Sequence, residues 1–112
     1  MNRPPGKILL KAERKEFLGR ITVYLADVLR RKVKVDRWTL TEIAAAAGVS
    51  NSVLSAAKHY DKWRIPISQN ILQRMIKGGL LNVDGILNNV PTNAREKEYL
   101  EKVGTKRPNH RR

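Results

Sequence analysis

Short polar side chains and cations lie close together between residues 50 and 64 of this chain. Asn51 carries an amide that can donate and accept at once, as the major-groove edge of an adenine requires. Ser52 and Ser55 can bond several bases, and small side chains permit a close approach. The cations that follow, suited to phosphate oxygens, are Lys58, Lys62 and Arg64. These residue types indicate contact with a polyanion.

Each of these residues also has an ordinary structural interpretation. Asn51 can help to cap a helix, and Ser52 and Ser55 can form a plain solvent-facing surface. Ala56 can contact a thymine methyl group or simply favour the helix. The cations can be solvated surface residues, so the choice depends on the charge of the whole chain.

That charge is strongly positive. The 112 residues include 23 Lys and Arg against 10 Asp and Glu, for a formal net charge of +13. Such an excess destabilises a compact chain by self-repulsion unless an anion neutralises it. Nucleic acid is the usual partner of such a chain, and an anionic membrane or an acidic protein is a less usual one. No apolar stretch has the length of a membrane span, so no membrane partner is expected.

The sequence offers little for catalysis. Its two histidines, His59 and His110, lie far apart and without a carboxylate cluster, so no metal site is expected. Cysteine is absent, which excludes a disulfide framework and fits a reducing cytoplasm. No nucleophile triad, phosphate-binding glycine loop or carboxylate pair stands out. We therefore expect no enzyme, catalytic residue, cofactor or small-molecule ligand.

Aromatic residues are few. Trp38 and Trp63 could stack on bases, but we interpret them as core or rim residues. Readers of single-stranded RNA depend on stacking rings, so the composition disfavours an RNA-binding protein.

The elements that must position these residues are predicted to be mainly helices. Apolar residues at helical spacing predict a long helix over 12–31, and 32–37 is expected to be a connection rather than a strand. Thr39 and Glu42 have the spacing of a capping box before a helix that ends at Gly48. Ser50 caps the next helix, to about residue 60, before a basic loop over 61–66. Further short helices are predicted over 68–77, 82–90 and 94–103.

The sequence thus predicts an all-α fold, a small domain of about five helices. We expect a flexible basic arm over 1–11, a helical domain over 12–103 and a disordered basic tail over 104–112.

Residues 40–59 have the residue types that two helices require where they meet at a steep angle through a tight turn. Ala44 is small where the helices cross, Gly48 can adopt the turn, and Val49 closes the corner. The inward apolar positions are Ile43, Ala47, Val53, Leu54 and Ala57. This segment resembles the helix-turn-helix of bacterial and phage repressors. An ordinary helical hairpin is the alternative.

The resemblance covers about residues 17–90, whose order of helices is similar to the five-helix domain of the lambda repressor and Cro family. It implies that the second motif helix lies in the major groove of double-stranded DNA. The base-contacting positions would then be Asn51, Ser52, Ser55 and His59, with Ala56 beside them. Thr41 and Ser50 would reach phosphates.

The resemblance implies a sequence-specific transcriptional regulator, a repressor of phage or plasmid type, in the cytoplasm and nucleoid of a bacterial or phage-infected cell. Such domains commonly pair, so a homodimer is expected, with 80–90 and 94–103 as candidate surfaces. The alternative is an accessory or architectural DNA-binding protein of recombination, the nucleoid or replication, without strong sequence specificity.

Overall fold

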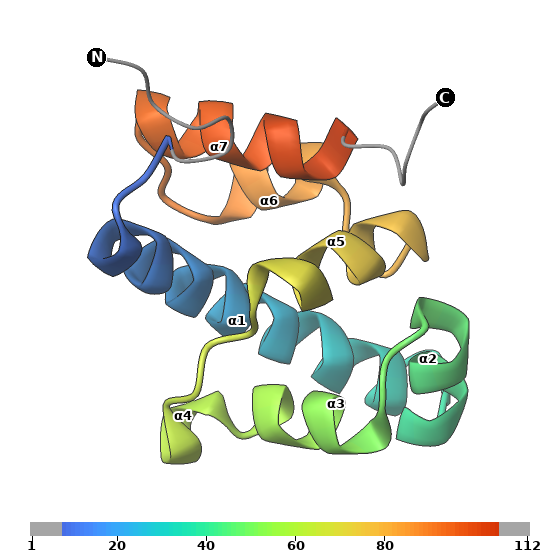
Figure 1. Ribbon diagram of the computed structural model, residues 1–112. Coiled ribbons are helices and arrows are strands. Elements are labelled where there is room, and N and C mark those ends of the chain that lie inside the picture. The colour runs from blue at the N-terminus through green and yellow to red at the C-terminus, as the bar shows by residue number, and fades with distance from the viewer. Residues whose placement is uncertain (1–7, 106–112) are drawn as a thin grey trace.

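The computed structural model describes residues 8–105, and every regular element in that range is a helix (Figure 1). The predicted all-α fold is therefore confirmed. The helices are α1 (Lys11–Lys34), α2 (Leu40–Ala47), α3 (Asn51–Lys58), α4 (Tyr60–Trp63), α5 (Gln69–Lys77), α6 (Val83–Asn89) and α7 (Ala94–Thr105).

Side-chain caps set where the helices begin. The Thr39 hydroxyl accepts from the Glu42 backbone N–H at 3.1 Å, and the Glu42 carboxylate accepts from the Thr39 backbone N–H at 2.9 Å. This reciprocal pair is the capping box that the sequence predicts before α2. The other predicted caps also accept a hydrogen bond from a backbone N–H in the first turn of their helices: Ser50 for α3, Ser68 for α5 and Asn82 for α6.

Helix number and some boundaries differ from the prediction. Residues 8–105 form seven helices rather than about five. The helix that lies where a loop was expected is α4, which has four residues. Within the expected loop over 61–66, residues 61–63 belong to α4. α1 continues through Lys34, so the connection to α2 is shorter than 32–37 and forms no strand.

The limits of the folded domain also differ. Leu9 is buried and α1 begins at Lys11, so residues 8–11 belong to the helical domain rather than to an arm. At the other end α7 reaches Thr105. The rest of the predicted arm and tail, residues 1–7 and 106–112, lies outside the described residues.

α1 is the central helix of the fold. Phe17, Ile21, Leu25 and Leu29 recur at helical spacing along it and are completely buried. α3 and α4 pack along one side of α1, while α6 packs on the other side and carries α7 (Figure 1). α5 contacts both α2 and α7 and so connects the two halves.

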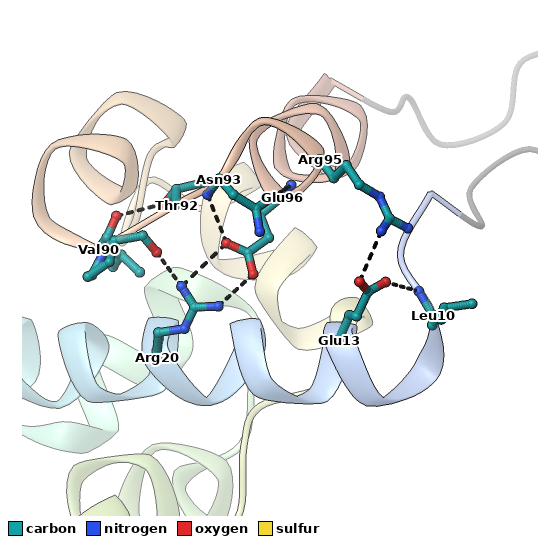
Figure 2. Close-up of polar contacts among 9 residues, drawn as sticks. Leu10, Glu13, Arg20, Val90, Thr92, Asn93, Arg95 and Glu96 are labelled. Carbon is teal, nitrogen blue, oxygen red and sulfur yellow. Dashed lines mark hydrogen bonds and ion pairs between the residues drawn. The ribbon is translucent and has the colours of Figure 1, made fainter.

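Polar contacts fix α7 to α1, as Figure 2 shows. The Arg20 guanidinium pairs with the buried Glu96 carboxylate at 2.5 Å and also donates to the Pro91 carbonyl oxygen. A more exposed pair joins Arg95 to Glu13 at 3.0 Å. Burial raises the pKa of Glu96, but hydrogen bonds from Arg20 and from the Asn93 backbone, with the charge of Arg20, hold that pKa below its ordinary value. The carboxylate therefore stays ionised near neutrality.

Candidate nucleic-acid interface

The turn between α2 and α3 depends on Gly48. Its φ of 73° and ψ of 32° lie in the left-handed region, which glycine adopts without steric cost. A Cβ at this position would meet no other atom within 4 Å, so the constraint comes from the backbone conformation alone. Val49 follows, partly buried and packed against the core. The sequence predicts both features.

A neighbouring helix also holds this turn. The Arg74 guanidinium, on α5, donates a hydrogen bond to the Gly48 carbonyl oxygen at 3.2 Å. Gly48 is the residue directly after α2, and the carbonyl groups at the end of a helix have no backbone N–H donor within that helix. Arg74 thus supplies a charged donor to the turn from outside the two helices.

α3 has one buried face and one exposed face. Leu54 and Ala57 are buried in the core together with Ile43, Ala44 and Ala47 of α2. The opposite positions, Asn51, Ser52, Ser55 and His59, are exposed, and Ala56 is partly buried. The structure therefore brings the predicted base-contact residues together along one side of the helix.

The predicted phosphate-contact residues lie around this face. The Asn51 amide donates to the Thr41 hydroxyl at 3.0 Å, which links the first turns of α2 and α3. The Ser50 hydroxyl accepts from the Val53 backbone N–H at 3.2 Å, so it caps α3 while its proton stays available to another acceptor. Lys58, at the other end of α3, is partly buried.

His59 ends α3 rather than extending it. Its φ of −107° and ψ of 35° interrupt the helix, and its ring nitrogen Nδ1 lies 3.0 Å from the Ser55 carbonyl oxygen. At that distance a protonated Nδ1 donates to the last turn. The ring is thereby held beside its own helix, at the edge of the exposed face.

Positive charge is concentrated in the half of the chain that carries α2 to α4. Residues 30–77 include ten Lys and Arg against three Asp and Glu, whereas residues 78–105 include three against four. Two predicted phosphate-contact residues, Lys62 on α4 and Arg64 just after it, are exposed. Arg30, on α1, donates to the Lys58 carbonyl oxygen at 3.1 Å and also pairs with Asp27 on its own helix, so it adds only a charge-paired cation beside α3.

The helical register of 68–77 predicts that Arg74 faces solvent or a phosphate, and Arg74 is exposed. Sequence reasoning missed the hydrogen bonds of Arg30 and Arg74, because each acts on a carbonyl oxygen at least 26 positions away in the chain. Trp63 was interpreted as a core or rim residue, yet its exposed fraction is 59%, which excludes the core. The cations on both sides of it in the sequence were the signal that could have indicated an exposed position.

Comparison with known proteins identifies no relative. The chain matches no protein-family model, and no curated protein or solved structure is significantly similar to it. Within residues 8–105, no group of three or more acidic or histidine side chains could hold a metal ion. No helix in that range combines the length and apolar character needed to cross a lipid bilayer.

Proposed function

We propose that this chain binds double-stranded DNA through a helix-turn-helix made of α2, the turn at Gly48 and α3, and that it acts as a sequence-specific transcriptional repressor. One observation carries the proposal. A short helix that follows a glycine turn presents Asn51, Ser52 and Ser55 on an exposed face while its other face is buried. Small polar side chains on such a face suit the edges of base pairs in a major groove.

Contacts in this proposal divide into two kinds. Asn51, Ser52 and Ser55 touch base edges near the start of α3, Ala56 meets a thymine methyl group, and His59 reaches the edge of the groove. Phosphate oxygens accept hydrogen bonds at the first turns of α2 and α3 and from the basic residues beyond α3. These phosphate contacts come from Thr41, Ser50, Lys58, Lys62 and Arg64.

The charge distribution supports the same orientation. The basic half of the chain, residues 30–77, includes α2, α3 and α4. Phosphate attraction therefore favours approach by the surface that carries the exposed face of α3. The nearly neutral half, with α6 and α7, would point away from the DNA.

Family membership and pairing are part of the proposal. We propose a distant relationship to the lambda repressor and Cro family, because a helix precedes the α2–α3 pair and further helices follow it. A homodimer would place two copies of α3 on a two-fold site. Its surface would use exposed and partly buried residues of 80–90 and 94–103. Six apolar side chains of these segments are buried in the chain's own core, whereas three are only partly buried: Leu80, Val83 and Leu87.

An accessory or architectural DNA-binding role is the second candidate. It is favoured by the charge outside the described residues: segments 1–7 and 106–112 hold six Lys and Arg and no acidic residue. Cations in such segments bind phosphates without reading sequence. The two functions differ in their ratio of specific to nonspecific affinity, which is large only for a repressor.

A matched pair of charge variants tests the α3 interface. Ser55→Glu places a carboxylate on the exposed face of α3, and Ala12→Glu places one on the exposed first turn of α1, outside both α3 and the proposed dimer surface. We expect Ser55→Glu to abolish binding to duplex DNA, because the carboxylate repels the phosphates there. Ala12→Glu should bind almost as the parent chain does. Equal affinities for the two variants, measured by fluorescence anisotropy of a labelled duplex, would contradict the proposal.

A further inference from the structure

The segment 62–65, directly after α3, has an unusual composition for an exposed turn. Its residues alternate cation and apolar side chain: Lys62, Trp63, Arg64 and Ile65. Trp63 is 59% exposed and Ile65 is 57% exposed. Single exposed apolar residues are common, but a tryptophan so exposed loses much of the free energy that its burial would provide.

Anchors on α1 hold this segment at both ends. Before it, the Tyr60 hydroxyl lies against Gly19, where an added Cβ would come within 2.6 Å of that oxygen. After it, the Ile67 backbone N–H donates to the buried Thr22 hydroxyl at 3.0 Å. Trp63 is therefore exposed on a turn that contacts with α1 hold in place on both sides.

Local bonds close the turn itself. The Trp63 backbone N–H donates to the His59 carbonyl oxygen at 3.0 Å, and that of Arg64 donates to the Tyr60 carbonyl oxygen at 2.8 Å. Arg64 then adopts a left-handed conformation with φ of 56°, which is uncommon for a residue other than glycine. Its guanidinium lies 5.9 Å from the centre of the Tyr60 ring. Trp63 is thus presented from a well-bonded turn between two cations.

We infer that Trp63 contacts DNA, packing its ring on the deoxyribose–phosphate backbone beside the site of α3 while Lys62 and Arg64 neutralise the flanking phosphates. The inference rests on the proposed function and extends its interface from α3 to α4. We choose DNA as the partner because segment 62–65 carries two cations, which complement phosphate charge, and lies close after α3 in the chain. Sugars offer apolar surface between phosphates, which matches the alternation along segment 62–65. The contact strengthens binding without reading sequence.

Three variants test the inference. Trp63→Ala should weaken binding to specific and random duplexes alike, by about tenfold if roughly 50 Å² of apolar surface is no longer buried. Trp63→Phe should recover most of that affinity, because it retains an aromatic ring. Leu10→Ala removes a side chain of similar exposure, 61%, on the α7 side of the molecule and should bind normally. All three should melt near the parent temperature, because the altered side chains are exposed.

The outcomes separate this inference from the proposed function. If Ser55→Glu abolishes binding and Trp63→Ala binds as the parent does, the inference is wrong and the proposed function stands. If the parent binds no duplex, both are wrong. Two further results would overturn the inference: Trp63→Ala losing attachment to anionic vesicles but not to DNA, or Trp63→Ala dissociating a dimer that exists without DNA.

Discussion

The Arg74 guanidinium reaches from α5 to the Gly48 carbonyl oxygen at 3.2 Å and so joins a helix outside the α2–α3 pair to the turn within it. A hydrogen bond from a charged donor is stronger than a neutral one, although exposure to solvent reduces its contribution. The turn before α3 therefore receives a hydrogen bond from a residue that belongs to neither α2 nor α3.

Removing this bond should loosen the turn. We expect Arg74→Ala to lower the free energy of unfolding by about 1 kcal/mol and to weaken DNA binding as well. Lys77→Ala is the control, because it removes the same charge from the exposed last turn of the same helix. If the two variants have equal stability and equal DNA affinity, Arg74 acts only through its charge and the turn does not depend on it.

Two glycines near this turn should respond differently to substitution. Gly48→Asn should cost little and Gly48→Val about 1–2 kcal/mol of unfolding free energy, because φ is 73° and the space around it is open. Gly78 has an ordinary φ of −81°, but an added Cβ would lie 2.8 Å from the Ala47 Cα. Gly78→Ala should therefore cost more than Gly48→Asn. Urea unfolding of the three variants checks this order, and the reverse order would contradict it.

Local signals predicted most of the helical framework. The cap residues Thr39, Ser50, Ser68 and Asn82 act on backbone groups within three positions, so their spacing is visible in the sequence. Gly48 is predictable for the same reason, because the end of one helix and the start of the next surround it. The amphipathic pattern also predicted which face of α3 is buried.

Long-range contacts explain what could not be predicted. α4 forms where a loop was expected because its first residue, Tyr60, fits against Gly19, and that site exists only after α1 and α3 have packed. The Arg20–Glu96 pair joins residues 76 positions apart. The exposure of Trp63 depends on anchors far away in the sequence, Gly19 and Thr22, although the cations beside it already favour an exposed position.

The Arg20–Glu96 pair predicts a pH dependence of stability. The pKa of Glu96 lies below its ordinary value of 4.5 in the folded chain, so the pair stabilises the fold above that pH. This contribution is lost as pH falls from about 4.5 through the lowered pKa. Glu96→Gln should cost on the order of 1–3 kcal/mol at neutral pH and should lose less stability on acidification. Glu98→Gln, an exposed neighbour on α7, is the control.

Melting temperatures measured from neutral pH to well below 4.5 check this prediction. The parent chain and Glu98→Gln should converge on the stability of Glu96→Gln in acid. If all three curves stay parallel throughout, the ion pair contributes nothing that depends on ionisation.

Salt should weaken DNA binding steeply. Neutralising a phosphate releases condensed counterions, so contact with about six phosphates gives a log–log slope near −5. Lys62→Ala and Arg64→Ala should each reduce the magnitude of this slope by about one and should weaken binding to all DNA sequences alike. Affinities measured across a salt series check this, and a slope near zero would exclude the electrostatic mode.

Selection of bound duplexes from a random pool tests most directly whether α3 reads DNA sequence. The account predicts that the parent chain enriches one short motif, in two-fold related copies if it pairs. Asn51→Ala and Ser55→Ala should melt normally and relax the preference at particular base pairs, by about 1–3 kcal/mol each. A pool that shows no enriched sequence despite tight binding, or a motif unchanged in both variants, would contradict the account and leave α3 without a reading role.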